Sequence, residues 1–492
     1  MRIRPAPLAA AAMANGTLAV AMLTALAPAA ASPGARRPDQ AAGKALTGSV
    51  GETAKPLASG TGGGARLWLN RLPKGGGRSV AVSPDGRTVY AAGTSDDGTP
   101  ADDDFVAVGY DAASGQQRWA ARYNGPGNGE DIGQAIATSP DGRTVYVAGT
   151  SDGGATGDDY AVVAYRAATG QRLWTARYDG PAGGTQLAAG MAVAPSGTSV
   201  YVTGFSATPD GNAAATVALG PADGRQRWAA LYRGPAGHGA SATAITAGPG
   251  GDDVFVAGDS DSDYATEAYR ASTGAQLWAR RYSALRNGGD EASAITAGPH
   301  GGQVYVTGSS FGGRTDADYA TVAYRGTTGK RLWVRRYNGA GRIDQPAAVA
   351  AAPGGRTVFV TGFSYGRRTS ADYATVAYRA GTGRPLWARR YNGPGNGFDR
   401  AFALAVSPDG RTVYVTGNST GKGTGRDVTT VAYRAATGAR LWLKRYDGPG
   451  RGFDGARALA VSPGGGRVFV TGTSAGPGSS GSQDFATIAY RG

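Results

Sequence analysis

The eight tryptophans of this chain fall at nearly regular intervals, and this spacing constrains the fold more than any other feature. Successive tryptophans are separated by 51, 55, 54, 50, 55, 54 and 55 residues. They are Trp68, Trp119, Trp174, Trp228, Trp278, Trp333, Trp387 and Trp442. Eight similar units of this length predict a repeat protein in which each unit buries its surface against its neighbours.

One unit, residues 398–446, reads as four β-strands. An apolar run is followed by Ser-Pro-Asp-Gly at 407–410, where Pro, Asp and Gly stand in the order of a type I turn. Val413–Thr416, a Gly-rich loop, Thr429–Tyr433 and a final strand with Trp442 complete the unit. No segment shows a helical period over a helix-like length. The pattern predicts an all-β fold, an eight-bladed β-propeller of four-stranded antiparallel blades.

The two ends of the repeated region complement each other. It opens with a lone strand at 66–69 and closes on three strands that finish at 484–490, without a fourth. Pairing the two ends would leave no unpaired sheet edge. We therefore expect residues 65–492 to form one ring, closed by the N-terminal outer strand joining the C-terminal blade. The blade at 188–232 departs furthest from the repeat.

The N-terminal region has a different character. Residues 1–31 read as a secretory signal peptide, because Arg2 and Arg4 precede an Ala-rich and Leu-rich stretch and three alanines at 29–31 suit cleavage. An uncleaved membrane anchor is the alternative. Residues 32–64 are rich in Gly, Ala and Pro, which predicts a disordered linker. A secreted or cell-surface location is expected, with no membrane span after cleavage.

The composition narrows the range of partners. The chain carries 50 Lys and Arg against 36 Asp and Glu, a formal charge of +14, and it has no Cys. The charge is spread over the repeats of an exported protein, so we expect no nucleic-acid partner. Anionic cell-wall polymers, acidic polysaccharides or other glycans, or a protein are better candidates. The ring itself is expected to be monomeric.

Residues 164–174, AYRAATGQRLW, resemble the tryptophan-docking motif of PQQ-like β-propellers, with Ala, Thr-Gly and Trp at the family's spacing. The Thr-Gly pattern recurs before Trp278, Trp333 and Trp387. The family's Asp is replaced by Arg in most copies, and Asp111 retains it. The VSPDGRTVYV segments also resemble the YVTN-type propeller repeat of surface and secreted proteins. The resemblance implies that each indole stacks between blades and bonds a neighbouring carbonyl.

The same resemblance implies an enzymatic alternative, a quinoprotein dehydrogenase that oxidises an alcohol or sugar with PQQ and Ca²⁺. Such a site needs oxygen ligands and a carboxylate base, and many of these enzymes carry a Cys pair over the cofactor. No Asn, Glu and Asp cluster stands out in one repeat, and every Trp belongs to the packing register. We therefore expect no catalytic residue and no cofactor, and retain the PQQ-dependent enzyme as the alternative.

The sequence offers few metal-ligand patterns. Asp259, Asp261 and Asp263 alternate as at the start of a calcium loop, but the Gly and distal Glu of such a loop are missing. They are weak metal candidates, and a structural role is favoured because Asp recurs at this place in most repeats. His238 and His300 lie in separate Gly-rich loops, so neither a zinc site nor a Ser-His pair is predicted.

A second recurring set favours structure over chemistry. An Asp in each NGPGNGFD-like loop and an Arg near each Arg-Tyr strand end repeat together around the chain, whereas an active site needs one asymmetric place. Asp131, Asp344, Asp399 and Asp454 are the acidic members, and Arg122, Arg177, Arg336, Arg390 and Arg445 the basic ones. We expect them to hold the blades together by hydrogen bonds.

Ligand binding is better sought where the repeats differ. Loops between second and third strands share a face of a propeller with loops that lead to the next blade. In this chain the variable loops carry Phe311, Arg314, Tyr365, Arg367, Arg368, Lys422 and Arg426. Aromatic and Arg side chains on loops stack on sugar rings and pair with anions. The sequence therefore predicts a binding scaffold that uses this long-loop face, and a merely solvated basic rim is the alternative.

Overall fold

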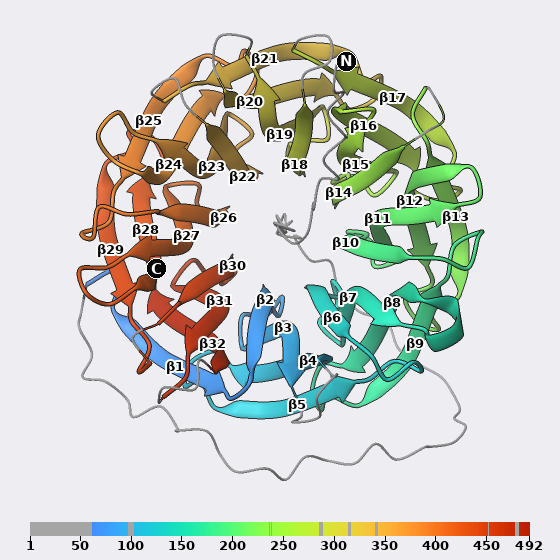
Figure 1. Ribbon diagram of the computed structural model, residues 1–492, viewed down its shortest axis with the longest axis horizontal. Helices are drawn as coiled ribbons and strands as arrows, with labels where there is room; N and C mark the ends of the chain where they lie inside the picture. The colour runs from blue at the N-terminus through green and yellow to red at the C-terminus, as the bar shows by residue number, and fades with distance from the viewer. Residues whose placement is uncertain are drawn as a thin grey trace, which may run out of the picture.

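The computed structural model describes residues 62–96, 103–235, 237, 239–284, 289–312, 316–339, 343–450, 452–477 and 482–492. These residues form eight four-stranded antiparallel sheets arranged around a central axis (Figure 1). The prediction of an all-β, eight-bladed propeller is confirmed. Most of the predicted signal peptide and linker, residues 1–61, lies outside the described residues, as does Arg314.

We number the blades in chain order and list each blade from the inner strand outwards. Blade 1 contains β2 (Gly75–Val82), β3 (Thr88–Asp96), β4 (Asp103–Asp111) and β5 (Gln117–Tyr123). Blade 2 contains β6 (Asp131–Thr138), β7 (Thr144–Asp152), β8 (Asp158–Arg166) and β9 (Arg172–Tyr178). Blade 3 contains β10 (Gln186–Val193), β11 (Val200–Thr208), β12 (Gly211–Leu219) and β13 (Gln226–Tyr232). Blade 4 contains β14 (Ala240–Ala247), β15 (Asp253–Ser260), β16 (Asp263–Arg270) and β17 (Gln276–Tyr282).

The second half of the ring repeats this arrangement. Blade 5 contains β18 (Asp290–Ala297), β19 (Gln303–Phe311), β20 (Ala317–Arg325) and β21 (Arg331–Tyr337). Blade 6 contains β22 (Asp344–Ala351), β23 (Thr357–Tyr365), β24 (Ala371–Arg379) and β25 (Pro385–Tyr391). Blade 7 contains β26 (Arg400–Val406), β27 (Thr412–Thr420), β28 (Arg426–Arg434) and β29 (Arg440–Tyr446). Blade 8 contains β30 (Gly455–Val461), β31 (Arg467–Ala475), β32 (Gln483–Arg491) and the N-terminal β1 (Arg66–Leu72).

The chain ends close the ring in the predicted way. β1 pairs antiparallel with β32 in register from Arg66 and Tyr490 to Leu72 and Phe485. The backbone hydrogen bond of the turn between third and outer strands is also reproduced, because the Gly64 N–H donates to the carbonyl of Arg491 at 2.9 Å. The last blade therefore has the same outer turn as the others, although two chain ends build it.

The indoles lie between neighbouring blades. Trp119 Nε1 donates to the carbonyl of Ala167 in the next blade at 2.8 Å, and Trp68, Trp174, Trp228, Trp278, Trp333 and Trp387 make the same kind of bond. Gly170 of the Thr-Gly turn has a φ of +71° and lies on the Trp119 ring, where a Cβ would approach within 2.6 Å. Gly64 takes this position over Trp442. A side chain there would displace the indole.

The recurring Arg residues fasten the outer strands by pairing with an Asp near the start of the third strand. Arg445 on β29 pairs with Asp427 on β28 at 2.6 Å and also donates to the Tyr391 hydroxyl of the preceding blade at 3.0 Å. Matching pairs occur at Arg177, Arg281, Arg336 and Arg390. Blade 3 has Leu231 and Ala213 at the two positions, so both partners are replaced together by apolar residues.

The recurring loop Asp is a buried staple. Asp399 is fully buried, and its carboxylate accepts the N–H groups of Gly393 at 2.6 Å and Thr420 at 2.8 Å. Asp131 and Asp454 make equivalent pairs of bonds. Burial raises the pKa of Asp399, opposed by these hydrogen bonds. The staple ties the loop entering a blade to the end of its second strand, on the long-loop face.

Candidate functional site

The predicted ligand-binding residues separate into two groups. Phe311 is exposed at the end of β19, and Arg367, Arg368 and Lys422 are exposed in the variable loops. No ring contact joins these four, among the described residues, to the inner part of the face. Tyr365 and Arg426, in contrast, both contact Phe398, which lies in the loop that enters blade 7.

An aromatic cluster surrounds Phe398. The Phe398 ring lies 5.3 Å from the Phe363 ring and 6.5 Å from the Tyr365 ring, centroid to centroid. The Arg426 guanidinium lies 5.1 Å from the centre of the Phe398 ring. A cation held over an aromatic face is stabilised by the ring quadrupole. Two members of the predicted basic and aromatic sector, Tyr365 and Arg426, are therefore grouped around Phe398, which the sequence had not singled out.

The cluster continues towards the axis through two further arginines. The Arg400 guanidinium lies 5.4 Å from the centre of the Phe363 ring and 4.8 Å from that of Phe402. The Arg457 guanidinium lies 5.0 Å from the same Phe402 ring. Cationic and aromatic groups thus alternate from the loops of blade 7 to the inner strand of blade 8. This geometry suits an elongated ligand with anionic groups and flat faces.

A β-bulge in the inner strand positions the side chains of Phe402 and Arg457, and also that of Arg78 in blade 1. Pairing with the second strand shifts by one residue at Arg78 in β2, at Phe402 in β26 and at Arg457 in β30. A bulged residue is left out of the ladder and its side chain is re-aimed. Other inner strands carry small or neutral residues there: Gln134, Ala189, Thr243, Ser293 and Ala347. A comparison of the repeats at this position would have revealed Arg78 and Arg457.

We call Arg78, Arg400 and Arg457 the arginine cluster. They come from three consecutive blades and are half-buried, and within the described part of the chain none of them makes a salt bridge. Burial lowers the pKa of Arg400 to about 10, and the nearby Arg457 adds to this effect. Burial and then Arg78 lower the pKa of Arg457. Three guanidinium groups that repel one another in partial burial form a site that an anion would stabilise.

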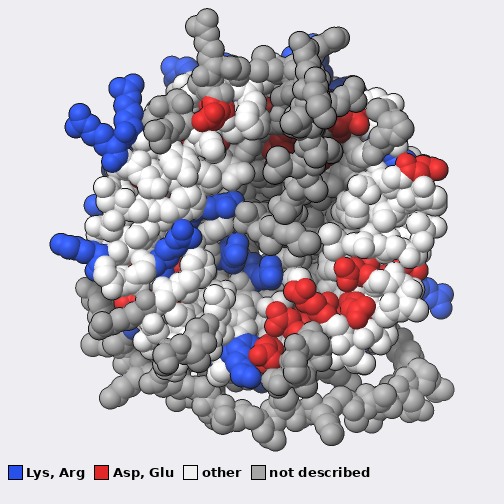
Figure 2. Space-filling model, viewed as in Figure 1, with Lys and Arg blue, Asp and Glu red and all other residues white. Residues whose placement is uncertain are grey.

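The surface charge around the cluster is uneven. Figure 2 shows basic side chains over the inner strands of blades 7, 8 and 1, and acidic ones gathered beside them over blades 1 and 2. Asp103 and Glu130 lie close enough to Arg78 to oppose the lowering of its pKa by burial. On the far side of the ring, burial and then Asp259 raise the pKa of Glu291. The surface around the central axis is therefore basic on one side and acidic on the other.

A pocket of about 400 Å³ adjoins the cluster where blade 8 meets blade 1. We call it the seam pocket. It is lined by Lys74, Gly75, Gly76, Gly77, Arg78, Thr94, Asp96, Asp103, Arg457, Thr473, Ser482 and Gln483. Its size falls within the usual range of small-molecule sites. The pocket offers cationic, carboxylate, hydroxyl and amide groups to one ligand.

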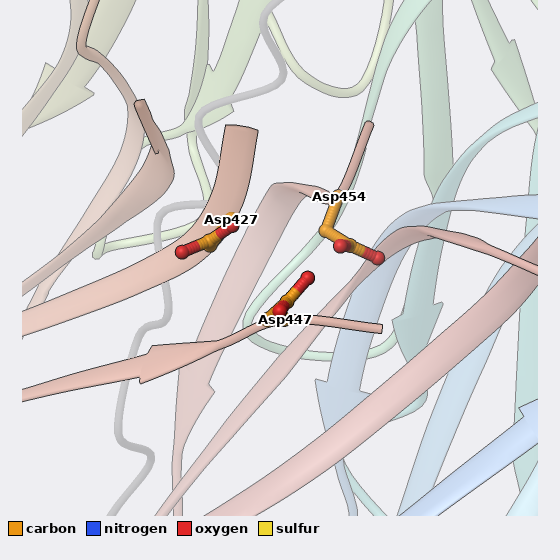
Figure 3. A group of neighbouring side chains, drawn as sticks. All are labelled: Asp427, Asp447 and Asp454. Carbon is orange, nitrogen blue, oxygen red and sulfur yellow. The ribbon is translucent and has the colours of Figure 1, made fainter. Parts of the chain in front are cut away.

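Three carboxylates meet elsewhere on the same face. Oxygens of Asp427, Asp447 and Asp454 lie within 4.8 Å of one another (Figure 3). Asp427 already pairs with Arg445, and Asp454 is the staple of blade 8. These contacts explain two of the three carboxylates by the repeated architecture, so the group does not by itself indicate a metal ion.

The weak metal candidates of blade 4 are not brought together. Asp261 and Asp263 both face Arg281, at 3.5 Å and 2.7 Å. Asp259 instead accepts a hydrogen bond from Ser241 Oγ at 2.6 Å, on the inner strand of the blade. The alternating carboxylates therefore serve different neighbours. His238 lies outside the described residues, and His300 lies in the turn after β18.

The fold and the repeat define a β-propeller of the PQQ-like class. A family model described as outer membrane protein assembly factor BamB matches residues 57–260, 101–351 and 264–476, which overlap and cover most of the chain. The chain belongs to this family of PQQ-like repeat propellers. No curated protein sequence matches it.

Solved structures agree on the architecture. BamB from Moraxella catarrhalis is 16% identical, with a TM-score of 0.51 over 87% of this chain and 99% of that one. Quinohemoprotein alcohol dehydrogenase from Comamonas testosteroni is 13% identical, with a TM-score of 0.58 over 87% and 76%. Chaetomium thermophilum Sqt1, bound to the N-terminus of ribosomal protein L10, is 12% identical, with a TM-score of 0.58 over 87% and 99%. At these identities the likeness shows the fold alone. Within the described residues, no helix is long and apolar enough to cross a membrane.

Proposed function

We propose that this protein is an exported scaffold that binds an anionic polymer through its long-loop face, with the arginine cluster as the centre of the site. The observation that supports this most directly is the closeness of three half-buried guanidinium groups. Asp103 and Glu130 partly offset the charge of Arg78, whereas no carboxylate among the described residues does so for Arg400 or Arg457. Retaining such charges is costly unless an anion compensates them. An acidic polysaccharide or other anionic cell-wall polymer would place charges on the arginines and a sugar face on the partly exposed Phe398.

The row of guanidinium and aromatic groups also explains why a polymer is favoured over a small ion. The contacts extend from Arg426 over Phe398 and Phe363 to Arg400, and then over Phe402 to Arg457. A small ion would contact one end of this row. A chain with repeated negative groups would use every guanidinium group at once, and the avidity would rise accordingly.

Binding of polygalacturonate to the purified protein tests the proposal, with neutral dextran as the comparison polymer. Arg400→Ala and Arg457→Ala should each weaken binding, and added salt should weaken it further because exposed charge pairs are screened. Arg411→Ala is the matched control, since Arg411 is an exposed arginine in the turn between β26 and β27, away from the long-loop face. Equal binding of both polymers, or equal loss in Arg411→Ala, would refute the proposal.

A PQQ-dependent dehydrogenase of alcohols or sugars is the second candidate. The cluster favours it in one respect, because PQQ carries carboxylates and Arg78, Arg400 and Arg457 would suit them. When bound, PQQ supplies the electron-accepting quinone, and this chain's arginines would bind and orient it. Reconstitution with PQQ and Ca²⁺ tests this candidate. Dye-linked oxidation of an alcohol that Arg457→Ala abolishes would support it, and inactivity after reconstitution would reject it.

A further inference from the structure

The seam pocket differs from the entrances of the other blades because three successive glycines of the inner strand line it. β2 begins with Gly75, Gly76 and Gly77, whereas most other inner strands begin at or directly after the buried Asp staple. A Cβ on Gly77 would lie 2.3 Å from Thr471 Oγ1, and one on Gly75 would lie 2.5 Å from the carbonyl of Thr94. Only glycine fits at these two places without displacing its neighbours, and both glycines line the pocket.

Two arginines line this space. Arg78 and Arg457 come from the bulges of adjacent inner strands, and each is half-buried. They approach closely enough for Arg78 to lower the pKa of Arg457. A guanidinium group presents a planar set of donors, which matches a carboxylate. One anionic group of the ligand belongs here.

The rest of the lining has a different character. Asp96 and Asp103 belong to it, with Lys74 3.6 Å from Asp96, and Thr94 and Thr473 contribute hydroxyl groups. Carboxylates repel a second negative charge but accept hydrogen bonds from hydroxyl groups. A ligand that uses the whole lining therefore carries one anionic group and several hydroxyl groups. A compact inorganic anion would use the arginines alone.

We propose that the seam pocket binds one acidic sugar unit, a hydroxylated ring with a single carboxylate, as the anchoring residue of a longer anionic glycan. The carboxylate lies against Arg78 and Arg457, and ring hydroxyls donate to Asp103 and Asp96. The pocket volume of about 400 Å³ accommodates a ligand of this size. This inference rests on the proposed function, because it assigns the chemical class of the ligand.

Competition experiments test it. Galacturonic acid should displace protein-bound polygalacturonate, whereas galactose, which differs in lacking the carboxylate, should not. Inorganic phosphate at matched ionic strength should displace much less. Arg78→Gln removes one of the two partners of the sugar carboxylate and should weaken galacturonic acid about tenfold, equivalent to ~1.4 kcal/mol. If phosphate competes as well as galacturonic acid, or if galactose does, the pocket is not selective for an acidic sugar and the inference is wrong.

A pair of variants separates this inference from the proposed function. Thr473→Val removes a hydroxyl from the pocket without changing charge, and Arg400→Ala removes a cation outside it. We expect Thr473→Val to weaken the monosaccharide and Arg400→Ala to weaken mainly the polymer. If Arg400→Ala weakens the polymer while Thr473→Val and Arg78→Gln leave galacturonic acid unaffected, the scaffold function stands and the sugar assignment fails. If the wild-type protein does not bind polygalacturonate, the proposed function itself fails.

Discussion

Glu267 on β16 is the most unusual buried residue of the ring, and its replacement gives the sharpest test of the packing. Its side chain is 1% exposed, and Oε2 has no hydrogen-bond partner. The other seven blades have an apolar residue at this position, within a core between two blades: Val108, Val163, Val217, Val322, Val376, Val431 and Ile488. Glu267→Val restores the repeat, and we expect it to stabilise the protein.

The magnitude follows from the protonation of the carboxyl. Burial raises the pKa of Glu267 from 4.5 to about 8, with Asp259 adding to the effect. The folded state therefore binds this proton more tightly than the unfolded state. The penalty is absent below pH about 4.5, grows as the pH rises, and levels off above about 8. At pH 7 it amounts to about 3 kcal/mol. For a ring of about 430 residues this corresponds to an increase of about 3 °C in Tm.

Calorimetry at several pH values measures this effect. The difference in unfolding free energy between Glu267→Val and wild type should rise by about 2 kcal/mol between pH 5 and pH 7. Glu267→Gln, which cannot ionise, should show the same pH trend relative to wild type. Glu130→Gln is the control, because Glu130 is exposed. A stability difference that does not change with pH would show that Glu267 does not titrate as argued.

Three further predictions concern the repeated contacts. Trp387→Phe removes the bond from the indole N–H to the Ala435 carbonyl and should destabilise the protein by about 1 kcal/mol or more in denaturant titration; unchanged stability would contradict the role of that bond. Asp290 is the equivalent staple of blade 5, and Asp290→Ala leaves the N–H groups of Ala284 and Phe311 without their acceptor, so Tm should fall while polygalacturonate affinity is retained; a selective loss of affinity would instead place Asp290 in the site. Deleting residues up to 72 removes β1 and exposes the edge of β32, so light scattering should detect concentration-dependent association, and a stable monomer would show that closure is dispensable.

The sequence predicts the architecture of this protein better than its site. The ring, its eight blades and its closure follow from Trp spacing and from the strands at the two ends, because a repeated pattern averages out local ambiguity. Arg78 and Arg457 were missed, since nothing in their local sequence marks the inner-strand bulge. Only the strand register shows that the bulged residue leaves the ladder and is re-aimed.

The interface between blades 3 and 4 explains part of the divergence of blade 3, which the sequence alone could detect but not explain. Ala214 replaces the aromatic residue that, in Tyr160 or Tyr319, sends a hydroxyl to a carbonyl of the next blade. It lies in the same core as Val256, the residue paired with Glu267. Ala214 and Glu267 therefore belong to the same interface between two blades. The two departures from the repeat meet there, and only the packed blades reveal it.

Because its blades repeat, each position in this protein can be compared with the equivalent positions of the other blades. A residue shared by most blades, such as the Asp399 staple, is explained by the ring, because every interface makes the same demand. A departure from the repeat inside a core must be tolerated by its neighbours, as Glu267 is at the interface between blades 3 and 4. A departure at the bulge, such as Arg457 on Phe402, is made in only some of the blades, so the ring does not explain its charge. The anionic ligand that we propose would explain it.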